Sequence, residues 1–248
     1  MADFNMANRQ CCDLDIREYS TNKPWMFADF CNTTTAGFKS DNTYANIKGE
    51  KAIAFNNPLE GTMTLEFQCH PFKIYSMLSD GTISTKAIVP VRKEVACTEA
   101  GTLTVAEEAA IAGTVFVYAK DDFGGTPIEG TAAITTSTVF TATAPADIAV
   151  DTTYLVCYLL QKTTGVKSVS FNGKKIPKDY RITMETVDKN EEGLLVPMKI
   201  TAYKATVQRT LDMSFSSTGD PAALKLTFDC LRDADGNVMD VIEETSEE

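Results

Sequence analysis

The chain has 248 residues, of which 44% are hydrophobic and 23% are charged, and its formal net charge is −11 at pH 7. This composition is typical of a globular protein with a substantial core, and it excludes a disordered polymer. Because proteins that read nucleic-acid sequences use lysine and arginine to neutralise phosphates, the acidic balance argues against that class.

The sequence carries no signal for export or membrane anchoring. It has no run of about eighteen consecutive apolar residues, and its start has no basic region followed by an apolar stretch. The seven cysteines form no CxxC pair, which favours free thiols in a reducing cytoplasm. We therefore expect assembly in a host cytoplasm and no membrane partner.

The first clear strand covers residues 62–69, where Met63, Leu65 and Phe67 alternate with polar residues. The stretch before it has weak periodicity. After the strand, Pro71 to Leu78 predicts one short helix, because proline suits a first helical turn and Gly81 can end the helix.

The composition shifts between residues 94 and 152, where threonine, alanine and glycine dominate and Lys120 is the only basic residue. Short strands are expected at 101–105, 114–118 and 134–142. We predict a small immunoglobulin-like β-sandwich at 94–152, inserted into a discontinuous core domain of residues 1–93 and 153–248. A single long hairpin is the alternative for the insertion.

The remaining strands are predicted at 180–186, 208–216 and 222–231, with turn residues between them. The predicted fold class is mainly β: an antiparallel sandwich or barrel-like fold. The acidic end, residues 240–248, carries five carboxylates and no basic residue. It suits a solvated tail, or a negative channel lining that repels DNA.

Motifs for catalysis, metals and cofactors are missing. The single histidine, His70, lies at a strand end, and no GxSxG elbow accompanies a serine. Asp233 to Asn237 resembles part of a calcium loop, but Leu231 and Ile242 occupy positions where an EF-hand needs carboxylates. We expect no enzyme, no cofactor and no metal site.

Three stretches resemble a known family. They are residues 169–200, with Val169-Ser-Phe-Asn-Gly and Ile176-Pro-Lys-Asp-Tyr; residues 211–237, with a Gly-Asp-Pro turn and a Leu-Thr-Phe-Asp strand; and residues 52–68, with a Gly-Thr-Met-Thr-Leu-Glu strand. Together they cover 76 of the 248 residues. They are similar to the tail tube proteins of tailed bacteriophages.

The resemblance implies a structural protein of the virion tail. In that family, subunits form rings, usually hexamers, whose strands line a channel for DNA, and the rings stack through loops and terminal arms. It implies copies of the same chain as the main partner. Terminator, tape measure, baseplate or sheath proteins are the further partners that it implies.

On this basis we predict two groups of assembly residues. Glu66, Asp212 and Asp229, on the polar faces of predicted strands, are candidates to face the lumen. Trp25, Phe27 and Phe30 belong to residues 1–30, which we expect to form an N-terminal arm against a neighbouring subunit.

Two other classes fit a β-rich, acidic chain without a catalytic site. A capsid decoration or other virion surface protein would bind capsids and form no tubes. A carbohydrate-binding, adhesin-like module would show clustered exposed aromatic residues on one sheet face.

Overall fold

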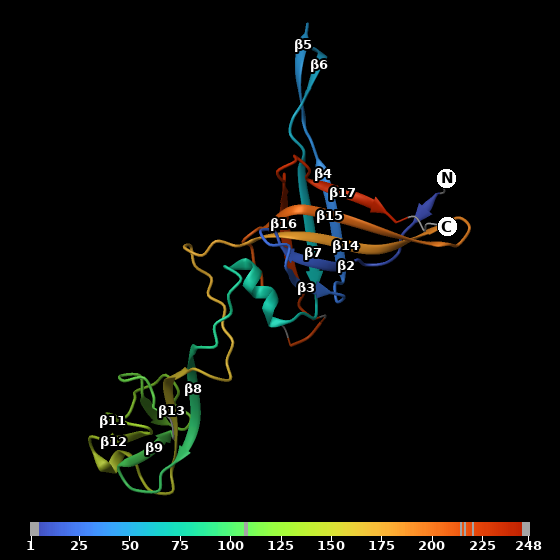
Figure 1. Cartoon of the computed structure of the whole chain (residues 1–248). Coiled ribbons are helices and arrows are strands. Elements are labelled where there is room, and N and C mark those ends of the chain that lie inside the picture. Colours follow the sequence, from blue (N-terminus) through green and yellow to red (C-terminus); the bar gives the residue numbers. More distant parts are fainter. Residues whose placement is uncertain (1–4, 107–108, 214, 216, 220, 245–248) are drawn as a thin grey trace. The chain divides into compact units, whose positions relative to one another are not determined.

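The chain folds almost entirely into antiparallel strands, as its period-two alternation predicts (Figure 1). The computed structural model describes residues 5–106, 109–213, 215, 217–219 and 221–244. The chain divides into two compact units, Met1–Thr82 with Val169–Glu248, and Ile83–Ser168. The mainly β, antiparallel fold class is confirmed.

The first unit contains a nine-stranded sheet. Its strands are β1 (Met6–Ala7), β2 (Asp13–Glu18), β3 (Pro24–Ala28), β4 (Thr33–Lys39), β7 (Glu60–Phe67), β14 (Asp179–Asn190), β15 (Leu195–Val207), β16 (Leu224–Leu231) and β17 (Met239–Glu243). The order is β3-β2-β14-β15-β16-β7-β4, with β1 beside β14 and β17 beside β15. This order has two ends, so the described residues of one copy form no closed barrel.

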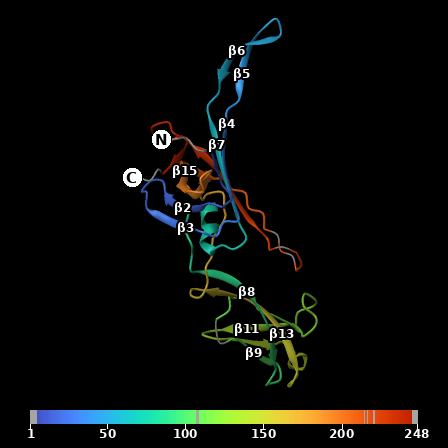
Figure 2. The ribbon, with the colours of Figure 1, turned by 90° about the vertical axis from the view of Figure 1, so that its right-hand side faces the viewer.

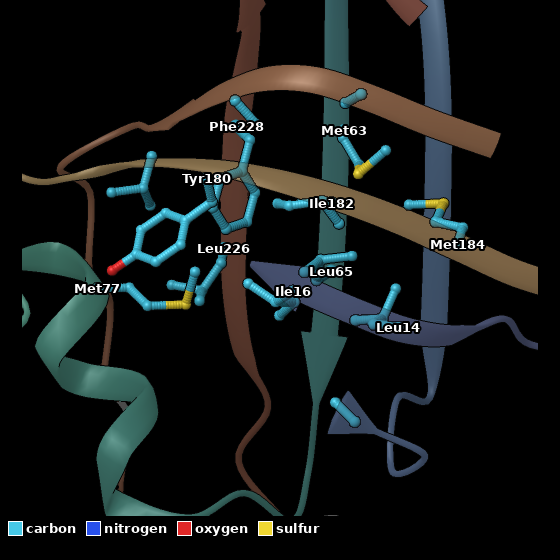
Figure 3. Close-up of a cluster of buried hydrophobic side chains, with 14 of the residues drawn as sticks. Leu14, Ile16, Met63, Leu65, Met77, Tyr180, Ile182, Met184, Leu226 and Phe228 are labelled. Carbon is cyan, nitrogen blue, oxygen red and sulfur yellow. The ribbon is translucent and has the colours of Figure 1, made fainter. Parts of the chain in front are cut away.

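The sheet folds back on itself, so that β2, β14 and β15 cross in front of β4, β7 and β16 (Figures 1 and 3). Side chains from both layers meet between them because alternate residues of each strand point inward. The fully buried residues of this core include Leu14, Ile16, Met63, Leu65, Phe67, Tyr180, Ile182, Leu226 and Phe228. The strands predicted at 62–69, 180–186 and 222–231 thus correspond to β7, β14 and β16.

The predicted helix is present as a 3₁₀ helix, η1 (Phe72–Leu78), which follows Pro71 in an extended conformation. It covers one end of the core through Ile74, Met77 and Leu78. Figure 3 shows Met77 beside Tyr180.

The interpretation of residues 1–30 as an arm is wrong for residues 13–28. They form β2 and β3, and β2 pairs with β14 from Glu18↔Tyr180 to Asp13↔Glu185. Leu14 and Ile16 alternate with charged residues and are fully buried. Burying these two side chains requires the long-range pairing with β14, and the short run of alternation alone does not reveal it.

The predicted strand over 208–216 is not found among the described residues. The β15 strand ends at Val207, and the chain leaves the sheet after Gln208, whose backbone amide donates to the carbonyl of Thr227. Leu211 packs partly against the core, but Met213 is 55% and Phe215 is 89% exposed. Alternation alone does not make a strand, because a strand also needs a neighbouring ladder.

The second unit is a small two-sheet sandwich. One sheet has the order β10-β13-β8 and the other β11-β12-β9. The strands are β8 (Ala87–Ala96), β9 (Thr102–Ala106), β10 (Phe116–Ala119), β11 (Gly130–Ile134), β12 (Thr138–Ala142) and β13 (Thr153–Lys162), with a short 3₁₀ helix η2 (Pro145–Asp147). Both sheets contribute to one core, which includes Leu103, Val117, Phe140 and Val156.

The second unit extends beyond residues 94–152, the range that the composition shift indicated. It includes the whole of β8 and β13, which pair with each other in its longest ladder. The strand predicted at 134–142 is instead the turn and second strand of the β11–β12 hairpin. Ser137 accepts a hydrogen bond from the amide of Thr135 in this turn.

Tyr180 offers a test of the core of the first unit. Its hydroxyl is buried and has no hydrogen-bond partner among the described residues, and burial raises the pKa of this hydroxyl. A buried hydroxyl without a partner costs stability, so Tyr180→Phe is expected to raise the free energy of unfolding by about 1 kcal/mol. Urea denaturation of both proteins measures the difference. A loss of stability would show that the hydroxyl has a favourable contact.

Candidate assembly surfaces

A two-stranded ribbon extends from the β4–β7 pair away from the core (Figures 1 and 2). Its strands are β5 (Asn42–Ile47) and β6 (Glu50–Asn56), and we call them, with their turn, the β5–β6 hairpin. Every residue of both strands is exposed. The turn residues Lys48 and Gly49 both have positive φ, at 51° and 88°, as the tight turn of a twisted hairpin requires.

The two faces of the β5–β6 hairpin differ in chemistry. Phe55 pairs with Thr43 and Ile53 with Ala45, so these side chains and Ile47 share one face. Ile47, Ile53 and Phe55 are 64%, 55% and 56% exposed. The opposite face carries Tyr44 and Asn46, with the Lys51 Nζ atom 4.0 Å from the centre of the Tyr44 ring.

A two-stranded hairpin with one exposed apolar face is marginally stable on its own in water. Contiguous exposed apolar side chains on a soluble protein usually mark a surface that binds another molecule. The apolar face of the β5–β6 hairpin is therefore the first candidate assembly surface.

The second candidate surface is a groove at the far end of the β14–β15 pair, between residues 5–10 and residues 187–195. Its volume is about 690 Å³. The amide nitrogen of Asn8 donates to Thr186 Oγ1 and to Asp188 Oδ1, both at 2.8 Å, and these bonds fix the N-terminal segment on the sheet. We call this feature the β14–β15 groove.

A third surface, the outer face of β2, β14, β15 and β17, carries many charged side chains. Arg17 pairs with Asp15 at 2.6 Å, and Lys199 pairs with Glu244 at 2.5 Å. Each carboxylate raises the pKa of its basic partner, first through the hydrogen bond between them. Arg17 and Lys199 are thus engaged by acids of the same chain.

The same outer face also carries a contact between a basic group and an aromatic ring, and a hydrogen bond to an acidic group. The Arg181 guanidinium lies 5.0 Å from the centre of the Tyr203 ring. The Tyr203 hydroxyl donates to Asp240 at 2.5 Å, and this bond is the main cause of the raised pKa of Tyr203. Asp240 belongs to β17, so the first part of the acidic end is a sheet strand, while residues 245–248 lie outside the described residues.

The structure places two of the three residues predicted to face the lumen on one face of the sheet, four positions apart along the paired strands. Glu66 and Asp229 lie on the outer face of the β7–β16 pair, where Lys225 is opposite Glu66. Asp229 accepts a hydrogen bond from Gln208 Nε2 at 2.7 Å. Asp212 lies apart from this face, in the exposed segment after β15. Their orientation toward a lumen stays a prediction.

The three aromatic residues of the predicted arm have different surroundings. Trp25 packs edge-on against Tyr180, with ring centres 5.4 Å apart, and Phe30 lies 5.6 Å from Phe67. Both therefore support the core of their own chain. Phe27 is 58% exposed, and it is the member of the group whose side chain is most available to a neighbour.

The remaining candidate groups have structural surroundings. His70 Nε2 lies 2.9 Å from the Tyr75 hydroxyl, and burial lowers the pKa of this histidine. All seven cysteines are free. Over the described part of the chain, no three histidine, cysteine or acidic residues are grouped to hold a metal ion. No helix in that part has the length and apolarity needed to span a membrane.

Sequence reasoning did not identify the β5–β6 hairpin or the β14–β15 groove as surfaces. The signal for the hairpin was present, since Ile53 and Phe55 alternate with alanines after a Lys-Gly turn. The groove has no local signal, because residues 5–10 and 187–195 are distant in the sequence.

Comparison with known proteins gives one family match. The model of the YomU/Tube protein family matches residues 9–242, which includes both surfaces apart from residues 5–8. No curated protein matches the chain. Because the match spans nearly the whole sequence, the chain belongs to the YomU/Tube protein family, in agreement with its resemblance to the tube proteins of phage tails.

Proposed function

We propose that the protein is a structural subunit of the phage virion tail, and that its copies form hexameric rings that stack into a hollow tube for DNA. The observation that carries the proposal is the apolar face of the β5–β6 hairpin, which the described residues of its own chain leave exposed. A copy of the same chain supplies a covering partner in a homo-oligomer. The proposed activity is assembly, without catalysis.

The charge of the chain supports a role as a conduit. A net charge of −11 repels DNA, and basic side chains such as Arg17 and Lys199 are paired with carboxylates. Basic groups that are paired in this way hold DNA phosphates less strongly than free ones do. Terminator, tape measure, baseplate or sheath proteins would contact the ends or the outside of the tube.

Electron microscopy of the purified protein tests this function. Negatively stained samples at rising concentration are expected to show hollow tubes of uniform width. Sedimentation of the same samples gives the lowest concentration at which assemblies are detected. A chain that stays monomeric at every concentration, and that antibodies locate only on the head shell of virions, would contradict the proposal and favour a capsid decoration protein.

A further inference from the structure

We propose that the outer face of the β10-β13-β8 sheet, in the second unit, binds the pyranose rings of a neutral polysaccharide. The inference goes beyond tube assembly. Its first support is that exposed aromatic residues gather on this face, a feature that marks a binding surface. Phe116 is 46% and Phe123 is 54% exposed.

The strand register places the aromatic side chains on the same side of the sheet. Val117 pairs with Val156, and both are fully buried in the core of the sandwich, so the residues on either side of Val117 point outward. Those residues are Phe116 and Tyr118. Phe123, in the loop after β10, joins them, because its ring centre lies 6.1 Å from that of Tyr118 in an edge-on contact. We call Phe116, Tyr118 and Phe123 the aromatic face.

Hydrogen-bonding groups border the aromatic face. Arg92 lies opposite Cys157 in the ladder between β8 and β13, and its guanidinium is 3.9 Å from the centre of the Phe123 ring. Glu94 is the next outward residue of β8, and it pairs with Lys120 at 3.1 Å. Arg92 and Lys120 carry N–H donors, and the Glu94 carboxylate carries acceptors. The aromatic face therefore combines ring surfaces with donors and acceptors at its edge.

This combination matches the chemistry of a sugar ring. A pyranose carries C–H groups on its two faces and hydroxyl groups around its rim. Stacking of a C–H face on an aromatic ring removes apolar surface from water, and the hydroxyls then need both donors and acceptors. Aromatic side chains with a few polar groups that fix the orientation of the ligand are typical of sites for small ligands.

The charges around the aromatic face favour an uncharged polymer. Lys120 and Glu94 neutralise each other, and the Arg92 guanidinium is stacked on Phe123. The chain as a whole carries a net charge of −11, which disfavours polyanions. A polymer can also place successive sugar rings on Phe116 and Phe123, so that weak contacts add. For a virion protein the source of such a polymer is the bacterial cell surface; this step rests on the proposed function, whereas sugar binding itself does not.

Affinity electrophoresis of the full-length protein tests the aromatic face. Native gels contain hydroxyethylcellulose, glycol chitin or mannan, and at least one of these polymers is expected to retard the protein. Phe116→Ala with Phe123→Ala is expected to weaken binding at least about tenfold, because two stacking contacts are lost. The matched control is Phe38→Ala with Phe171→Ala, which removes two phenylalanines of the first unit that are 63% and 49% exposed. Its retardation should equal that of the parent protein.

A variant that keeps an aromatic ring provides a measurement that does not depend on a loss of binding. Phe116→Trp should retain binding, and its emission should shift to shorter wavelength when the hexasaccharide of the retarding polymer is added. The parent protein has a single tryptophan, Trp25, which packs against Tyr180 in the first unit, so its emission should not shift. Absence of a shift in the variant would contradict stacking at position 116.

Several results would overturn the inference and leave tube assembly, which electron microscopy measures separately, intact. The first is a parent protein that none of the polymers retards. The second is equal retardation of the parent and of the variant that lacks Phe116 and Phe123. The third is self-association without any polysaccharide that this variant abolishes, since the aromatic face would then be a contact between copies of the chain.

Discussion

The double replacement Ile53→Asp with Phe55→Asp is expected to abolish tube formation at concentrations where the parent protein assembles. Fully burying one such side chain contributes about 1.5–3 kcal/mol, so the loss of two weakens each contact by about 3–6 kcal/mol. This corresponds to a rise of at least about a hundredfold in the concentration needed for assembly. Sedimentation and negative-stain microscopy measure the change.

Folding of the single chain should not change in this variant. Ile53 and Phe55 are exposed and lie outside the core, and exposed substitutions usually change stability by about 0.5 kcal/mol or less. The matched control is Asn46→Asp with Ala54→Asp, which adds the same charge to the opposite face of the β5–β6 hairpin. Equal loss of assembly in both variants would show that charge on the hairpin, and not its apolar face, controls assembly.

Phe228→Ala is expected to lower the free energy of unfolding of the first unit by about 3–5 kcal/mol. The Phe228 side chain is fully buried between the two layers of the sheet (Figure 3), so its removal leaves a cavity as well as lost contacts. Chemical denaturation followed by circular dichroism measures the loss.

The second unit serves as an internal reference for this measurement, because it has its own core around Val117 and Val156. A transition that belongs to the second unit should stay at the same denaturant concentration in the variant. Lys225→Ala, on the exposed face of the same strand, should leave both transitions nearly unchanged. A loss below about 1 kcal/mol for Phe228→Ala would contradict the position of this side chain in the core.

The alternation of apolar and polar residues predicted the main strands wherever one face of the strand is buried and the other is accessible to solvent. Met63 and Leu65 in β7, and Leu226 and Phe228 in β16, point into the core while the residues between them are more accessible. The mainly β class follows from such runs, and the turn residues between them indicate antiparallel connections.

The same reasoning failed in opposite directions at two segments. Residues 13–28 are strands of the core sheet because β14, far along the chain, pairs with β2. Residues 208–216 alternate as regularly, yet the structure describes no strand there. In both cases the outcome depends on whether another strand lies beside the segment and pairs with it. A local sequence pattern does not show this.

The sequence by itself determined the strand class, the tube family that the chain resembles and the two-faced character of its strands, because side chains alternate along any extended chain. Only the tertiary structure decided which apolar faces are covered. Met63 and Leu65 are buried because β2 and β14 cross over β7, whereas Ile53 and Phe55 follow the same alternation and are exposed because β6 extends beyond that layer. Burial depends on what packs against a face, and that is set by contacts between segments distant in the sequence.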